Sequence, residues 1–212
     1  MKEVLISIKP KWCWKIASGE KTIEVRKTAP KEVPFKAYIY CTSSDVHSAL
    51  VVGDGDAKLI HCCNYKNAIP VGGAIGNGKV IGEFVCDKIY PIKAEYDDGG
   101  SAERRHKSIE TFLPGKEHNE LVFAMCLETD ELFDYLGNGK WGYGWHISDL
   151  KIYDKPKELS EFYVISESGS DCCCGCVWQE TPLDEMPCRT CTAERKYLYR
   201  PPQSWQYVEE LK

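Results

Sequence analysis

The sequence has no long hydrophobic run, few histidines and methionines, and no overall excess of basic residues. No apolar stretch approaches the roughly 18 residues that a membrane-spanning helix requires, which excludes a protein built from such helices. The short apolar segment 4–8 is followed at once by Lys9, Pro10 and Lys11, so we expect no secretion signal. The net charge of −5 excludes a protein that is basic over its whole surface. We therefore expect a soluble, cytoplasmic protein with no membrane partner.

The composition is otherwise that of an ordinary globular protein. Apolar residues make up 43% of the 212 residues, charged residues 28% and aromatic residues 11%, which excludes a chain that is disordered or coiled-coil throughout. The small polar residues at 166–171 predict a linker. We therefore expect a large domain at 1–165 and a C-terminal tail at 166–212 that packs on it.

The charge is distributed unevenly along the chain. Residues 1–36 carry nine basic and four acidic side chains, whereas the rest of the chain is acidic. A locally basic face on an acidic body suits an anionic ligand of limited footprint and not the wrapping of a long duplex. A basic face that is merely solvated would give the same distribution.

The alternation of apolar and polar residues predicts short strands interleaved with short helices. Pro10 favours the start of a helix and Gly19 its end. The segment 42–78 predicts a long irregular excursion, with one helix or strand near residues 61–65. The expected strands are 2–8, 21–27, 35–41, 79–90, 121–128 and 145–153, and the expected helices are 11–18, 101–112, 129–136 and one turn at 156–162. This order predicts a mixed α+β domain built on a small β-barrel that short helices flank.

Cysteines are numerous and cluster in the C-terminal tail. Two C-x2-C pairs, Cys173 with Cys176 and Cys188 with Cys191, follow each other in a short segment. Such pairs can place four thiolates around one zinc ion, which would supply the folding energy that a small tail lacks. The spacing predicts a structural zinc site, with Cys172 and Cys174 as alternative ligands. A redox-active or disulfide-bonded cluster is the other interpretation.

A phosphate-binding loop is excluded despite a partial match. The segment from Gly73 to Lys79 satisfies G-x4-G-K, but Val80 follows where a hydroxyl is required. The residues after it predict a strand, whereas the phosphates need the N-terminus of a helix.

The segment Gly19-Glu-Lys21-Thr-Ile-Glu24-Val-Arg26 has the strongest functional pattern. Glu24 and Arg26 lie two apart on one face of the expected strand. Lys21 has the opposite parity, so it joins them only if the chain bends as it enters the strand. A cation, an acceptor and a planar guanidinium at one junction could hold a base edge together with a phosphate. A solvated ladder of ion pairs is the alternative interpretation.

This segment and its surroundings resemble the ASCH domain, a family related to the PUA-like β-barrels. The resemblance rests on Leu5-Ile-Ser-Ile-Lys-Pro10, on the helix that follows it, and on the Gly-x-Lys-x-x-Glu-x-Arg motif. Later segments, Gly78-Lys-Val-Ile-Gly-Glu-Phe84 and Trp145-His-Ile-Ser-Asp-Leu150, are similar to barrel strands of that family. The resemblance covers about residues 1–165.

The resemblance implies binding of RNA or modified bases in a cleft between the first helix and the barrel. The residues that it assigns to the cleft are Gly19, Lys21, Glu24 and Arg26, with Lys9, Trp12, Lys15, Trp145 and His146 as neighbours. From the residues alone, a packed core position is the stronger interpretation for Trp145, and a structural role is the stronger one for His146.

The resemblance also leaves an enzymatic function open. Some small members of the family are amidohydrolases that act on acetylated cytidine and use a threonine three residues after the lysine, where this chain has Glu24. A glutamate cannot replace a hydroxyl nucleophile in acyl transfer. Lys21 and Glu24 could still catalyse another hydrolysis, of RNA or of a modified nucleoside. A zinc-stabilised adaptor that binds a protein partner is the third possibility.

Overall fold

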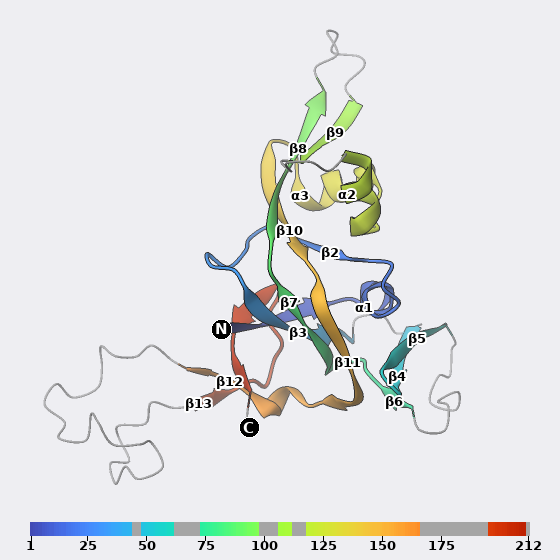
Figure 1. Ribbon diagram of the computed structural model, residues 1–212, viewed down its shortest axis with the longest axis vertical. Coiled ribbons are helices and arrows are strands. Elements are labelled where there is room, and N and C mark those ends of the chain that lie inside the picture. Colours follow the sequence, from blue (N-terminus) through green and yellow to red (C-terminus); the bar gives the residue numbers. More distant parts are fainter. Residues whose placement is uncertain (44–47, 62–72, 98–105, 112–117, 166–194, 211–212) are drawn as a thin grey trace, which may run out of the picture.

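The computed structural model describes residues 1–43, 48–61, 73–97, 106–111, 118–165 and 195–210. It is built mostly of β-sheet, with few and short helices (Figure 1). No helix within these ranges is long and apolar enough to cross a membrane. The described strands form four sheets, and no closed ring is traced by their pairing, so the closed barrel remains a prediction.

The largest sheet has five strands in the order β11-β7-β3-β1-β14. Its strands β1 and β3 are parallel, and the other neighbours are antiparallel. The helix α1 (Pro10–Ala17) follows β1 and buries Cys13 and Ile16 against it. The strands are β1 (Lys2–Ile8), β3 (Phe35–Cys41), β7 (Lys79–Cys86), β11 (Ser148–Lys157) and β14 (Trp205–Tyr207). The main core lies between this sheet, α1 and the three-stranded sheet that contains residues 48–61.

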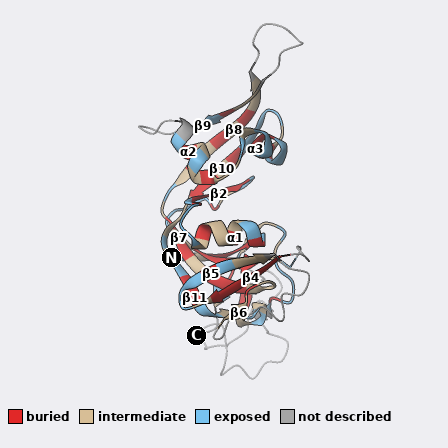
Figure 2. Cartoon of the chain, turned by 90° about the vertical axis from the view of Figure 1, so that its right-hand side faces the viewer, coloured by how far each residue is buried: buried red, intermediate tan, exposed pale blue. Residues whose placement is uncertain are grey.

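A second sheet has four strands in the order β2-β10-β8-β9, and it carries the candidate site on its edge. The helices α2 and α3 lie together beside it (Figure 1) and pack on its apolar face. In Figure 2, β2 lies between α1 and α2. The elements are β2 (Ile23–Arg26), β8 (Ile89–Asp97), β9 (His106–Thr111), β10 (Lys140–His146), α2 (His118–Met125) and α3 (Thr129–Leu136).

Two small sheets complete the described fold. The first contains β4 (Ser48–Gly53), β5 (Asp56–His61) and β6 (Ala74–Ile75). The second contains β12 (Phe162–Ile165), β13 (Arg195–Tyr197) and β15 (Glu209–Glu210), and the 3-10 turn Leu159–Glu161 precedes it. The described end of the chain therefore joins the sheets of the large domain, where β14 pairs with β1 and β15 with β12.

The N-terminal elements, α3 and the 3-10 turn are confirmed, and four expectations are wrong. The segment 101–112 was expected to be helical, but residues 106–111 form β9, where Ile109 is buried and Glu110 exposed in strand alternation. The strand at 121–128 is instead the helix α2, because Leu121 and Met125 share one buried helical face while Phe123 is exposed. The excursion at 42–78 contains a hairpin, β4 and β5, across Asp54 and Gly55. The expected strand 145–153 spans parts of two strands, β10 and β11.

Candidate functional site

The bend that the motif requires is present between α1 and β2. Gly19 has φ +77°, a left-handed conformation that a residue without Cβ adopts at little cost, and it ends the helix. The N–H of Lys21 then donates to the carbonyl of Lys15, 2.8 Å away, so the chain folds back over the last turn of α1. The N–H of Thr22 donates to the carbonyl of Ala124 in α2 at 3.0 Å. Lys21 therefore enters the site from the turn, before the regular strand begins.

Two cations of the motif, Lys21 and Arg26, converge on the carboxylate of Glu24. Glu24 Oε1 lies 3.0 Å from Arg26 Nη2, and Glu24 Oε2 lies 3.4 Å from Lys21 Nζ. All three residues are buried, with exposed fractions of 2% for Lys21, 7% for Glu24 and 8% for Arg26. We call Lys21, Glu24 and Arg26 the triad. Its two cations and one carboxylate are withdrawn from water, so it is not a solvated ladder.

The triad also ties three parts of the fold together. Lys21 Nζ donates to the carbonyl oxygen of Met125 in α2 at 2.5 Å, and Arg26 Nη2 donates to that of Ser7 in β1 at 2.7 Å. Arg26 Nε is buried and has no hydrogen-bond partner among the described residues. Buried N–H donors are normally paired, so an unpaired Nε at this position is unusual.

Burial sets the proton affinity of the groups at the site. It lowers the pKa of Lys21, because removal from water disfavours the ammonium, and the opposing attraction of Glu24 only partly offsets this. Burial raises the pKa of the Cys13 thiol well above its usual value. A lysine with a lowered pKa can change its protonation state more readily than an exposed one, which is a property of catalytic lysines.

Two aromatic rings border the triad. The Trp12 ring has Lys21 Nζ 5.3 Å from its centroid and Lys11 Nζ 4.4 Å from it. Tyr135 on α3 lies near Arg26, whose positive charge acts on its hydroxyl, and burial raises the pKa of that hydroxyl. Sequence reasoning did not find Tyr135, because more than a hundred residues separate it from the motif. The one feature of the sequence that could have indicated Tyr135 is its position outside the buried stripe of α3, as an aromatic residue that the helix does not need for packing.

The other predicted neighbours lie in different surroundings. Trp145 is directly opposite Glu24 in the strand register but is fully buried, with its ring against Phe35 and Trp205. His146 follows on the other face of β10, where its Nδ1 lies 2.6 Å from Asp87 Oδ1. These positions agree with the core interpretation of Trp145 and the structural interpretation of His146.

The two lysines of the predicted set lie around α1. Lys15 forms a 3.8 Å ion pair with Glu20 through its side chain, while its backbone holds Lys21. Lys9 is exposed, and its carbonyl accepts the first hydrogen bonds of α1. The structure therefore brings the side chains of Trp12, Lys21, Glu24 and Arg26 together, and it places the side chains of Lys9, Lys15 and His146 outside this group.

The predicted zinc ligands Cys173, Cys176, Cys188 and Cys191 lie outside the described residues, as do Cys172 and Cys174. Within the described ranges, no group of three or more His, Cys, Asp or Glu side chains is arranged to hold a metal ion.

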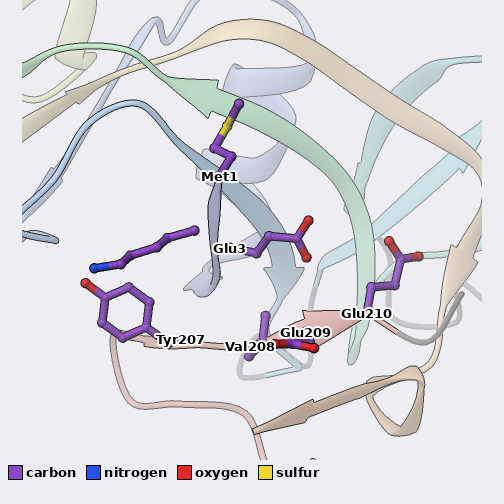
Figure 3. A pocket seen from close by; sticks show the side chains of 7 residues that line it. Met1, Glu3, Tyr207, Val208, Glu209 and Glu210 are labelled. Atoms are coloured by element: carbon purple, nitrogen blue, oxygen red, sulfur yellow. The ribbon is translucent and has the colours of Figure 1, made fainter. Parts of the chain in front are cut away.

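A hollow of about 630 Å³ lies elsewhere, where the first residues of the chain meet the C-terminal strands (Figure 3). Three of the side chains that line it are acidic: Glu3, Glu209 and Glu210. Each of them already has partners. The Tyr38 hydroxyl lies 2.9 Å from Glu3 and 3.0 Å from Glu210 and shares its one proton between them, and both carboxylates also form ion pairs with lysines. Glu209 accepts a hydrogen bond from the Tyr163 hydroxyl. The hollow does not include the triad, and its carboxylates serve to fasten the C-terminal arm.

Comparison with known proteins finds similarity only among solved structures. No protein-family model matches the chain, and no curated protein matches it. An ASCH protein from Zymomonas mobilis is 16% identical, with a TM-score of 0.47 over 98% of this chain and 88% of that chain. A single-residue variant of that protein, ZmASCH, is also 16% identical, with a TM-score of 0.46 over 99% of this chain and 91% of that one. The structural neighbours are thus ASCH domain proteins.

Proposed function

We propose that this chain is an ASCH-like protein that binds RNA or a nucleotide at the triad. The observation that carries the proposal is the convergence of Lys21 and Arg26 on one buried carboxylate, Glu24, at 3.4 and 3.0 Å. The cluster has one more positive than negative charge, in a region where burial weakens the screening of that charge. The Gly-x-Lys-x-x-Glu-x-Arg motif, which resembles that of the ASCH family, points to the same ligand.

Each group in the triad has a role that suits a nucleotide. The guanidinium of Arg26 can hold a phosphate or a base edge in two parallel hydrogen bonds, and its free Nε adds a donor. The Glu24 carboxylate can accept a hydrogen bond from an exocyclic amine of a base. The Lys21 ammonium lies 3.4 Å from Glu24 Oε2 and offsets the charge of this carboxylate in a buried position.

Trp12 supplies a stacking surface next to these groups. It is partly exposed, and the ammonium of Lys11 lies over its ring. Lys11 is an exposed, flexible residue at the start of α1. It can leave the ring at little cost, and a base can then stack in its place while Lys11 turns to a phosphate.

The test is equilibrium binding of a fluorescein-labelled uridine hexamer, measured by anisotropy at several salt concentrations. The test variant is Lys21→Met, Glu24→Leu and Arg26→Met combined, since buried ion clusters can be replaced by apolar residues of similar size without loss of the fold. The matched control is Lys155→Met, an exposed lysine of β11. We expect the triple variant to melt normally and to lose hexamer binding by at least about tenfold. Equal affinity in the triple variant and the wild type would refute the proposal.

A hydrolase is the second candidate, and one observation favours it. Lys21 combines a lowered pKa with an ion pair to Glu24, so the two groups can exchange a proton with a bound substrate. In that case Glu24→Asp would retain binding of the hexamer and lose turnover. An intact hexamer after prolonged incubation with the wild-type protein would leave binding as the whole function.

The C-terminal tail is proposed to hold a structural zinc ion through Cys173, Cys176, Cys188 and Cys191. The proposal depends on their paired C-x2-C spacing and on the chemistry of four thiolates, which leave no open position for catalysis. Elemental analysis of the protein purified under reducing conditions tests it. We expect one zinc ion per chain, and its absence would contradict the site.

A further inference from the structure

The face of the four-stranded sheet that α2 and α3 leave uncovered continues directly from the triad. Alternate residues of a strand point to opposite faces. A Cβ added to Gly142 would lie 2.4 Å from Leu136 of α3, so the even positions of β10 face the helices. The odd positions Trp141, Tyr143 and Trp145 therefore share the opposite face with Glu24 and Arg26 of β2.

This face is covered at one end and open at the other. Trp145, opposite Glu24, is fully buried under Phe35 and Trp205. Tyr143, directly opposite Arg26, is half-buried. Trp141, two residues further from the core, is 48% exposed. The exposure of the aromatic rings thus rises steadily along β10 as the strand leaves the main core.

Basic groups accompany these aromatic rings. Arg26 is the register partner of Tyr143, and Lys93 of β8 is the register partner of Trp141. Directly opposite residues of an antiparallel pair are side-chain neighbours. Lys93 Nζ lies 5.9 Å from the centre of the Trp141 ring. The face therefore presents two pairs, each of one aromatic ring and one cation.

We propose that a single strand of RNA lies along β10 on this face, with one base at the triad and the next bases stacked on Tyr143 and Trp141. The inference rests on the proposed function of the triad and adds the length and the path of its ligand. Aromatic rings two residues apart on a strand are roughly 7 Å from each other. Two such platforms side by side can each take one splayed base, which a duplex cannot offer because its bases remain paired.

Charge on the neighbouring strands fixes the path. Glu95 lies 2.5 Å from Lys93, and Glu110 of β9 is the register partner of Lys93. The β9 edge of the face is therefore acidic and repels a phosphate backbone. The opposite edge carries the guanidinium of Arg26, the register partner of Tyr143. The strand of RNA consequently follows β10 on its β2 side.

The experiment compares a uridine hexamer with uridine monophosphate on the full chain. The variant is Trp141→Ala, and the matched control is Phe123→Ala, an 82% exposed aromatic residue on α2, at the other face of the sheet. Stacking of one base on an aromatic side chain predicts roughly 5- to 150-fold weaker hexamer binding in Trp141→Ala. We expect unchanged monophosphate binding in both variants, unchanged hexamer binding in Phe123→Ala, and partial recovery in Trp141→Phe.

The outcomes separate this inference from the proposed function. Hexamer binding that Trp141→Ala leaves unchanged, while the triple triad variant loses it, would overturn the path and keep the triad as a nucleotide site. Hexamer binding that survives in the triple triad variant would overturn both proposals. A DNA hexamer bound as tightly as RNA would overturn the assignment to RNA.

Discussion

Replacing Glu24 by glutamine tests whether the triad is as buried and as interdependent as the geometry indicates. The substitution keeps the size of the side chain and removes its charge. Lys21 and Arg26 are then left as two cations, 2% and 8% exposed, that retain backbone carbonyl oxygens as hydrogen-bond acceptors but have lost their carboxylate. Removing one partner of a buried ion pair costs about 3–5 kcal/mol, because the remaining charge is neither solvated nor neutralised.

This cost is large enough to measure by urea denaturation followed by circular dichroism. With an m-value of about 2 kcal/mol per M, the midpoint falls by about 1.5–2.5 M. The matched control is Glu20→Gln, which breaks a 3.8 Å ion pair with Lys15 in which the two side chains are 50% and 25% exposed. Exposed pairs contribute about 0–1 kcal/mol, so we expect little change in that midpoint.

Combining Lys21→Met with Glu24→Gln removes one of the two uncompensated cations. We expect this double variant to be more stable than Glu24→Gln alone, because only Arg26 then lacks its carboxylate. If Glu24→Gln costs no more than Glu20→Gln, the charges of the triad are reached by water and the reasoning from burial is wrong.

Further predictions concern packing, reactivity and pH. Gly142→Ala should lower the free energy of unfolding by about 1–3 kcal/mol, because the new methyl group meets Leu136, and a shift in the urea midpoint measures it. Cys13, fully buried with a raised pKa, should react with iodoacetamide more slowly than the partly exposed Cys126, as peptide mass spectrometry would show; equal rates would contradict the packing of α1. Since the pKa of Lys21 is lower in the folded chain than its usual 10.5, the unfolded chain binds more protons between those two values. Stability relative to Lys21→Met should therefore rise with pH in that interval, and a flat difference would contradict the shift.

The N-terminal part of the fold could be predicted because its signals are local. Pro10 and Gly19 mark the ends of α1, and the alternation in β1 and β3 gives their bounds. The convergence of Lys21 with Glu24 and Arg26 could also be predicted. Lys21 has the opposite strand parity to the other two, so the three side chains can meet only if the chain bends before the strand. The structure supplies that bend through the hydrogen bond from the N–H of Lys21 to Lys15.

The rest depended on contacts between distant segments. The run around Leu121 is uniformly apolar and has no period, so only its packing against β2 decides that it is a helix. Asp54 and Gly55 form an Asp-Gly pair between two apolar runs, which is a sequence pattern typical of a β-hairpin. Sequence reasoning did not use this pattern and predicted an irregular segment instead. Tyr135 and Trp141 carry no motif. The placement of α3 brings Tyr135 near Arg26, and strand register pairs Trp141 with Lys93.

The most direct test of the central claim is to observe the ammonium of Lys21 itself while a ligand binds. NMR of protein labelled at the lysine ε-carbon, assigned with Lys21→Met, follows the titration of this group without and with saturating uridine hexamer. A phosphate or base held at the triad adds negative charge or acceptors beside Lys21, so its pKa should rise and its resonance should shift. A Lys21 resonance and titration midpoint that the bound hexamer leaves unchanged would contradict the account.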